Sequence, residues 1–272
     1  MKRKLYPEGK RKAFNITYDD GAQQDERFVA LLNQYGMKGT FHLNSELMKN
    51  GFTWTHESGL EIRRLSAQKA RLLYQGHEVA SHSLTHPCFE GMTRQQLLWE
   101  IGMDRYFLQE IFGTEIGGFA VPFDYYDEAA ADCVRECGFS YARTSQESHG
   151  YCPGYDWYWQ KAGIYHISGD LKQYVEGFLH TQEELAFGQI VGHSYDLDTL
   201  QMWELMESLI SRVAADKDTL PVTHLEAVRY WQAMQKAVIE EAYIFNGSDT
   251  VLWFEINGKV CSVSPGERLE IK

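Results

Sequence analysis

The chain has 272 residues, which is long enough for one large domain with a full hydrophobic core. Hydrophobic residues make up 44% of it and charged residues 24%, so the composition is that of a globular protein and excludes intrinsic disorder. The formal net charge of −12 argues against nucleic acid and anionic lipid as partners, because both attract basic surfaces.

Short β-rich runs alternate with longer amphipathic segments over most of the chain. The expected strands are 13–18, 39–44, 78–81, 118–123, 140–144, 164–167, 189–192 and 220–224. The expected helices are 25–34, 67–75, 93–112, 127–137, 198–215 and 226–237, and residues 45–66 are expected to form an irregular insertion. This alternation predicts βα units and a parallel sheet, and their number favours an α/β fold of the distorted (β/α)7–8 barrel type. No nucleotide-binding fingerprint follows the first strand, where a Rossmann fold would carry one.

The tail from 242 to 272 has a different pattern. Two Asn-Gly pairs, at 246–247 and 257–258, separate β-rich runs, and Asn-Gly is the strongest short hairpin signal. We therefore expect a barrel domain over 1–241 and a small antiparallel β appendage over 242–272. This appendage is expected to cover one end of the barrel or to form a homo-oligomer contact.

The sequence also carries an expectation about compartment. It has no run of about 18 apolar residues, and the basic residues 1–12 are not followed by the apolar core of a signal peptide. Five cysteines without a paired framework suit a reducing compartment. These features predict a cytoplasmic protein with no membrane partner.

Polar residues that could carry chemistry stand at the ends of the expected strands, where βα barrels place their functional side chains. Asp19 and Asp20 follow the first strand, and His82 and His86 follow the third, four residues apart and on one face of a helical turn. Two imidazoles and one carboxylate form a common site for a catalytic divalent metal. One aspartate would bind the ion and the other would be free to act as a general base. The alternative is that these are helix-capping and hydrogen-bonded loop residues.

Two of these segments resemble the motifs of a known family. Residues 17–21 (TYDDG) resemble the TFDDG motif of polysaccharide deacetylases, the NodB-homology domain of carbohydrate esterase family four, and residues 82–86 (HSLTH) match its H-[ST]-x-x-H motif. The resemblance covers about residues 10–235 and implies the same distorted barrel. It implies that Asp20, His82 and His86 hold a divalent metal, with Zn²⁺ preferred and Co²⁺, Ni²⁺ or Mn²⁺ as alternatives.

The same resemblance implies roles for three further residues. Asp19 corresponds to the base that activates water, and His193 corresponds to the acid that protonates the leaving amine. Phe123 stands where the family has the residue whose backbone N–H helps to bind the oxyanion. The implied reaction is the metal-dependent removal of an N-acetyl group from a carbohydrate.

The third family motif, R-x-P-[YF], is altered because residues 120–123 read AVPF. The missing arginine ordinarily orients the base, and Arg143, near the end of the neighbouring strand, is our candidate replacement. The alternative for Arg143 is a structural ion pair. Loss of the arginine at position 120 also leaves open a carbohydrate-binding protein without catalysis.

Several further residues are candidates for substrate contact. His42 and Asn44 share one strand face, and His224 could line the rim, although hydrogen-bonded interior positions are the alternative for all three. The aromatic loop around Trp157 could stack on sugar rings or pack onto the barrel; its members are Tyr151, Tyr155, Trp157, Tyr158 and Trp159. The substrate would be a carbohydrate or, in a second class of function, a small or cyclic amide with a hydrolysable C–N bond.

Overall fold

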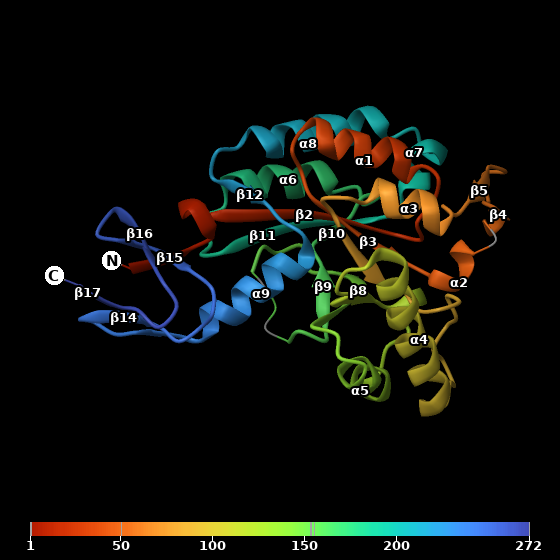
Figure 1. The fold of residues 1–272 in the computed structure, drawn as a ribbon. Coiled ribbons are helices and arrows are strands. Elements are labelled where there is room, and N and C mark those ends of the chain that lie inside the picture. Colours follow the sequence, from red (N-terminus) through yellow and green to blue (C-terminus); the bar gives the residue numbers. More distant parts are fainter. Residues whose placement is uncertain (1, 50, 153, 155, 272) are drawn as a thin grey trace.

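The computed structural model describes residues 2–49, 51–152, 154 and 156–271, and its centre is a nearly closed barrel of parallel strands (Figure 1). Around the barrel the hydrogen-bonded order is β10-β11-β2-β3-β6-β7-β8-β9, and β12 pairs with the first part of β2. The strands are β2 (Lys12–Asp19), β3 (Gly39–Leu43), β6 (Glu78–Ser81), β7 (Gly118–Ala120), β8 (Tyr141–Glu147), β9 (Gln160–Ala162), β10 (Ile164–Tyr165), β11 (Ala186–Gly192) and β12 (Thr219–Pro221). The expected distorted (β/α) barrel is therefore confirmed.

The barrel is closed by a strand that is interrupted at one glycine. β9 pairs with β8 and β10 pairs with β11, and only Gly163 lies between β9 and β10. A Cβ atom at Gly163 would lie 2.3 Å from the backbone oxygen of Gln189 and 2.2 Å from the hydroxyl of Tyr174. Glycine is thus required where the two edges of the sheet meet.

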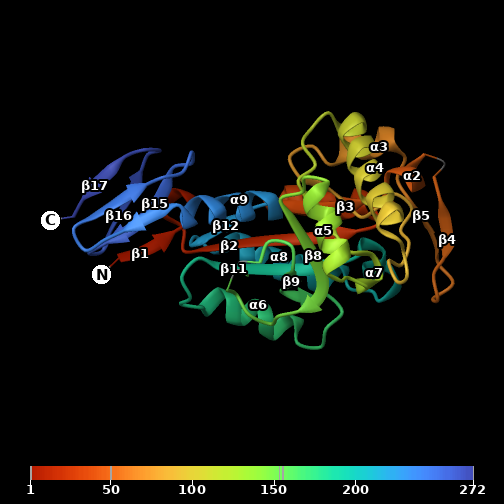
Figure 2. The same ribbon diagram turned by 90° about the horizontal axis from the view of Figure 1, so that it is seen from below.

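Helices lie around the outside of the strands (Figures 1 and 2). They are α1 (Asp25–Gln34), α2 (Ser45–Met48), α3 (Ala67–Leu73), α4 (Arg94–Phe112), α5 (Glu128–Glu136), α6 (Leu171–His180), α7 (Ser194–Thr199), α8 (Trp203–Ala215) and α9 (His224–Gln235). The long helix α4 begins at a capping box formed by Thr93 and Gln96 and ends at Gly113 in the left-handed conformation. The largest hydrophobic cluster, which includes Phe28, Phe41 and Phe119, lies between the strands and these helices.

Four segments differ from the expectations. Helix α6 was not expected, and the single helix expected over 198–215 is divided into α7 and α8. The insertion at 45–66 is not irregular, because it contains α2 and a hairpin of β4 (Thr53–Thr55) and β5 (Glu61–Arg63). The strand expected over 220–224 ends at Pro221, because Thr223 and Glu226 form a capping box that starts α9 at His224.

Helix α9 leads from the barrel to a β appendage, into which both ends of the chain run (Figure 2). The appendage holds two antiparallel sheets, one of β1 (Lys2–Leu5), β15 (Leu252–Ile256) and β16 (Lys259–Val263), the other of β13 (Ala237–Ile239), β14 (Tyr243–Asn246) and β17 (Arg268–Glu270). The expected Asn-Gly turn at 257–258 joins β15 to β16, with positive φ at both residues.

The second Asn-Gly pair does not form the expected two-residue hairpin turn. Asn246 donates its side-chain amide to the carbonyls of Thr250 and Val263, at 2.8 Å each, and the chain then passes from β14 in one sheet to β15 in the other. In the part of the chain that the structure describes, no helix is long and apolar enough to cross a bilayer.

Candidate metal centre and active site

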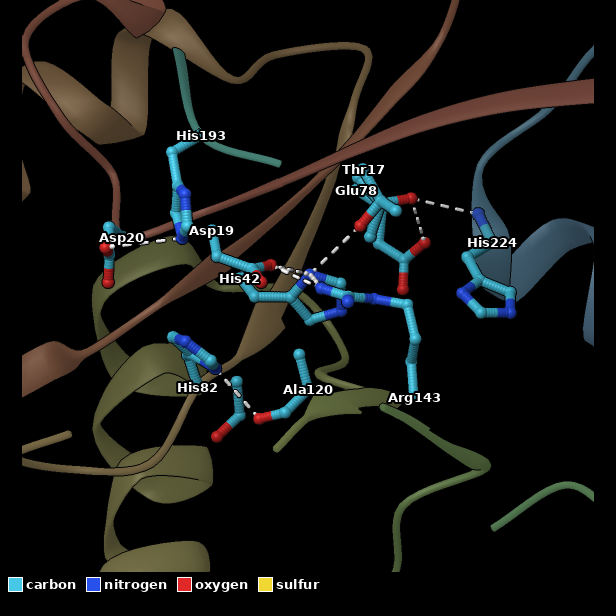
Figure 3. A network of polar contacts seen from close by, with 12 residues as sticks. Thr17, Asp19, Asp20, His42, Glu78, His82, Ala120, Arg143, His193 and His224 are labelled. Atoms are coloured by element: carbon cyan, nitrogen blue, oxygen red, sulfur yellow. Dashed lines mark hydrogen bonds and ion pairs between the residues drawn. The ribbon is translucent and has the colours of Figure 1, made fainter. Parts of the chain in front are cut away.

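Three strand ends bring the motif residues together at one end of the barrel (Figure 3). Asp19 is the last residue of β2 and Asp20 follows it, while His82 follows β6 and His193 follows β11. Because β2 pairs with β11 and β3, and β3 pairs with β6, these carboxyl ends meet at a single opening.

Asp20, His82 and His86 form a group of metal-ligand type. One donor atom from each residue lies within 4.8 Å of the others. The two Nε2 atoms of the histidines are 3.1 Å apart, close to the separation of about 3.3 Å that two Zn–N bonds of about 2.05 Å impose at a tetrahedral angle. The Nδ1 atom of His82 is 2.9 Å from the carbonyl oxygen of Ala120, which orients the ring with Nε2 toward the centre. The donor set therefore fits a divalent ion such as Zn²⁺.

The charge state of these residues also fits a metal. Burial would raise the pKa of Asp20, but Arg64 and the neighbouring histidines outweigh burial and hold that pKa well below its usual range. Burial, helped by the nearby His82, lowers the pKa of His86 to about 4. Burial also lowers the pKa of His82. At neutral pH the group is thus one carboxylate and two neutral imidazoles, the forms that bind metals.

Asp19 lies beside this group and is held by Arg143, the residue that was proposed as its partner. Arg143 Nη2 is 2.5 Å from Asp19 Oδ1, and His42 Nδ1 is 3.0 Å from the same oxygen. Burial would raise the pKa of Asp19, yet the Arg143 charge, with His82 and His42, keeps it well below its usual range. Ala120 is the register partner of Arg143 on the adjacent strand β7, so the guanidinium has moved by one strand from its place in the family motif.

His193 lies near the second carboxylate oxygen of Asp20, with its Nε2 3.8 Å from Oδ2, whereas His86 Nε2 is 3.6 Å from Oδ1. Its Nδ1 is 2.8 Å from the hydroxyl of Tyr165 and 3.2 Å from Asp196 Oδ2. Burial lowers the pKa of His193, but the Asp196 hydrogen bond and the nearby aspartates raise it more, so the net shift is upward.

Three residues around His193 are not among the predicted site residues. They are its partners Tyr165 and Asp196, and His166, a second imidazole 3.0 Å from Asp196. Only the spacing of three residues between His193 and Asp196 could have indicated a contact, since such spacing brings side chains together in a helical turn.

Three residues expected to touch substrate are buried instead. His42 and Asn44 have no exposed surface, and His224 is 1% exposed. His42 contacts Asp19, and Asn44 donates its amide to the carbonyls of His82 and Ser83. The rim position expected for His224 is wrong, because the residue starts α9 and its Nδ1 lies 3.2 Å from the Gln189 amide inside the barrel.

The expected aromatic platform around Trp157 is wrong as well. Trp157 stacks on Trp231 of α9, with ring centroids 6.2 Å apart, and belongs to the cluster at the appendage end of the barrel. The hydroxyls of Tyr151 and Tyr158 donate to the carbonyls of Tyr174 and Phe139. Trp159 packs against Tyr126, and Tyr155 lies outside the described residues. The loop thus packs onto the barrel, which was the alternative.

Aromatic rings near the metal-ligand group come from other segments. Phe123 is 67% exposed and its ring centroid is 4.6 Å from that of His86. Tyr195 donates its hydroxyl to Asp20 Oδ2 at 3.1 Å, and Trp54 of the β4–β5 hairpin meets the Tyr195 ring edge-on at 5.5 Å. The sequence offered no periodicity that would place Trp54 or Tyr195 here.

The fold and the site together indicate a class of protein. It is a (β/α) barrel whose carboxyl-end opening holds a candidate metal centre of one aspartate and two histidines, with a further aspartate beside it. Residues 7–142, half of the 272-residue chain, match the family model described as polysaccharide deacetylase. The chain therefore belongs to the polysaccharide deacetylase family.

Solved structures share the fold at low sequence identity. A candidate polysaccharide deacetylase of Mycobacterium smegmatis is 15% identical with a TM-score of 0.60, and the match covers 86% of this chain and 94% of that one. BA3943 of Bacillus anthracis, a pseudoenzyme of carbohydrate esterase family four, is 13% identical with a TM-score of 0.52, covering 83% and 68%. A family four acetyl xylan esterase of Clostridium thermocellum, in complex with cobalt, is 16% identical with a TM-score of 0.50, covering 80% and 90%. The chain has no significant match among curated proteins.

Proposed function

We propose that this protein is a metal-dependent hydrolase that removes N-acetyl groups from a carbohydrate. The observation that carries the proposal is the group of Asp20, His82 and His86, whose donor atoms lie within 4.8 Å of one another, beside the arginine-bound Asp19. Membership of the polysaccharide deacetylase family supports a carbohydrate as substrate. Zn²⁺ is the preferred ion, and the cobalt complex of the acetyl xylan esterase supports Co²⁺ as an alternative.

A divalent ion held by these three side chains would polarise the amide carbonyl and make a nearby water more acidic. Asp19, ionised and held by Arg143, accepts the proton of the attacking water. His193, whose Nε2 lies 3.8 Å from Asp20 Oδ2, donates a proton to the departing nitrogen, and Asp196 and Tyr165 fix its ring. The exposed Phe123 lies next to His86, where its backbone N–H can stabilise the oxyanion. The products are acetate and an amino sugar.

A catalytically inactive carbohydrate-binding protein is the second candidate, because Ala120 replaces the motif arginine and a structural relative is a pseudoenzyme. The contact between Arg143 and Asp19 favours catalysis, since it restores a guanidinium to the base. A hydrolase of a small or cyclic amide would use the same side chains, and only the substrate would differ.

The experiment is acetate release from N-acetyl chitooligosaccharides by chelator-treated protein, without metal and with Zn²⁺ or Co²⁺ restored. Acetylated xylan and a panel of small amides form parallel arms. We expect metal-dependent acetate release from the N-acetyl sugar, and we expect His82→Ala to lose both metal binding and hydrolysis. Metal-independent turnover, or turnover retained by His82→Ala, would contradict the proposed mechanism. Hydrolysis confined to small amides or to acetylated xylan would instead reassign the substrate, and carbohydrate binding without turnover in any arm would support the inactive protein.

A further inference from the structure

The β4–β5 hairpin is anchored directly to the loop that carries Asp20. The Gln23 amide donates to the carbonyl of Arg63 at 2.8 Å, and the Leu65 amide donates to the carbonyl of Gly21 at 2.8 Å. Ala22 and Arg64 form an isolated antiparallel bridge. This backbone docking places the side chain of Arg64 beside Asp20.

Arg64 is 5% exposed and connects both loops that carry metal-ligand residues. Its Nη2 is 2.9 Å from Asp20 Oδ1, and its Nη1 donates to the Asp20 carbonyl and, at 2.7 Å, to Asn44 Oδ1. The Asn44 amide in turn donates to the carbonyls of His82 and Ser83, at 2.5 and 2.8 Å. One guanidinium and one amide therefore hold the Asp20 loop against the loop of His82 and His86.

Both loops contain non-glycine residues in the left-handed backbone region. The φ angles are 80° at Asp20, 68° at Ser83 and 58° at His86. Such conformations persist only where the surrounding structure enforces them, and the bonds from Arg64 and Asn44 end on Asp20, His82 and Ser83 themselves. These hydrogen bonds can therefore hold the two loops in their left-handed backbone conformations.

We propose that Arg64, through Asn44, is a positioning residue that holds Asp20, His82 and His86 in metal-binding geometry, and thereby makes the β4–β5 hairpin part of the metal site. This inference rests on the metal site of the proposed function. Asp20 can still bind an ion, because a carboxylate offers about four lone-pair positions and Arg64 and Tyr195 use two of them.

A simpler role for Arg64 would be to neutralise Asp20, and the two roles predict opposite effects on metal affinity. A positive charge beside a cation repels it, so removing a merely neutralising arginine would tighten metal binding. Two of the three Arg64 contacts are with neutral oxygens, and the uncharged Asn44 shares the network, which charge neutralisation does not require. Positioning therefore predicts weaker binding when either residue is truncated.

The experiment is calorimetric titration of chelator-treated full-length protein with Zn²⁺, supported by the absorption spectrum of bound Co²⁺. We expect Arg64→Ala, Arg64→Lys and Asn44→Ala each to weaken Zn²⁺ binding by about 10–100-fold, the range found for residues that support metal ligands. The double variant of Arg64→Ala and Asn44→Ala should be little weaker than either single variant, because both remove one network. The Co²⁺ spectrum of the variants should differ from that of the wild type.

The neighbouring Arg63 is the matched control, because its side chain is 60% exposed and contacts Glu61 at 3.7 Å. Arg63→Ala should leave Zn²⁺ affinity unchanged. Unchanged or tighter binding in Arg64→Ala, with Arg64→Lys like the wild type, would overturn the positioning role. If Arg64→Ala fails to fold, as judged by circular dichroism in chelator, Arg64→Lys and Asn44→Ala decide the question. A wild-type protein that binds neither metal would instead overturn the metal site of the proposed function.

Discussion

The positive charge that faces Asp19 comes from Arg143 on β8. In the family motif the corresponding arginine stands at the position of Ala120, on the adjacent strand β7. Arg143 is 2% exposed and lies beside Ala120, its register partner. Side chains of register partners on adjacent parallel strands point to the same side of the sheet. We therefore expect a guanidinium from either position to reach the same carboxylate, and we propose that the altered motif is a relocation of one contact.

This relocation predicts a rescue. Arg143→Ala should lower kcat for acetate release by roughly 100-fold or more, because it removes the group that orients the proposed general base and leaves the buried Asp19 carboxylate without its charged partner. Zn²⁺ affinity should remain, since Arg143 does not contact the donor group. Adding Ala120→Arg to Arg143→Ala should restore part of kcat. Ala120→Arg alone is the control for crowding, and it should not raise the rate because Arg143 already fills the space. A double variant no better than Arg143→Ala would show that the two positions are not equivalent.

Glu78, the first residue of β6, is a buried carboxyl group inside the barrel. It accepts hydrogen bonds of 2.9 Å from the Thr40 hydroxyl, the Tyr141 hydroxyl and the Leu225 amide. Burial raises the pKa of Glu78 from 4.5 to about 7, against the effect of these bonds. Between these two values the folded state binds more protons than the unfolded state, so this group makes the fold less stable as the pH rises.

Glu78→Gln should remove that pH dependence. Relative to the wild type, its free energy of unfolding should rise by roughly 2–3 kcal/mol between pH 5 and pH 8, because most of the shift of about 2.5 pKa units falls in this window. Urea unfolding in chelator at the two pH values measures the difference. The exposed Glu110 of α4 gives a matched control, Glu110→Gln, which should follow the wild type. Parallel curves for Glu78→Gln and the wild type would rule out this titration.

At the residue scale, Asp20, His82 and His86 are predictable as one group because they follow strands that lie near each other in the sheet and resemble the motifs of one family. Arg64 and Tyr195 could not be found in the same way. Arg64 reaches Asp20 only because the hairpin docks on residues 21–23, and Tyr195 reaches it from the helix after β11. Neither contact leaves a periodic or spaced signal in the chain.

At the scale of elements, the bounds of α1 and the start of α4 were predictable, and α6 was not. α1 begins and ends where the sequence predicts, and α4 begins at its Thr93 cap. α6 contains Gly177, which weakens a helical pattern, and this glycine is needed because a Cβ there would lie 2.5 Å from the Tyr151 hydroxyl. Tyr151, the first aromatic residue of the loop at 151–159, therefore packs against α6, and the glycine that makes room for it also obscures the helical pattern.

Two further breaks, one after α7 and one between β9 and β10, were also not predicted from the sequence. The chain leaves the helical conformation at Gln201, where φ is 55°, with neither glycine nor proline to mark the end of α7. The strand broken at Gly163 is divided because its halves pair with different neighbours, β8 and β11. Such breaks follow from the closure of the barrel, which local sequence does not encode.

On the scale of the whole molecule, the appendage and the barrel share one hydrophobic cluster. Phe254 and Leu252 of β15 lie in the same cluster as Trp231 of α9 and Phe187 of β11, and Phe254 has no exposed surface. The first strand, β1, pairs with β15, and the next residue, Tyr6, donates to the Leu185 carbonyl at 2.9 Å. The two parts are therefore expected to unfold together.

Phe254→Ala tests this coupling. Loss of a fully buried phenylalanine should cost about 3–5 kcal/mol of unfolding free energy, and in a coupled molecule the loss reaches the proposed metal site at the other end of the barrel. Urea unfolding followed by circular dichroism and by release of bound Co²⁺ should give coincident transitions, both shifted to lower urea. Val260→Ala, at a 53% exposed position of β16, is the matched control and should shift neither transition by more than about 0.5 kcal/mol. If Co²⁺ release stays at the wild-type urea concentration while an earlier transition appears in circular dichroism, the appendage unfolds as an independent unit.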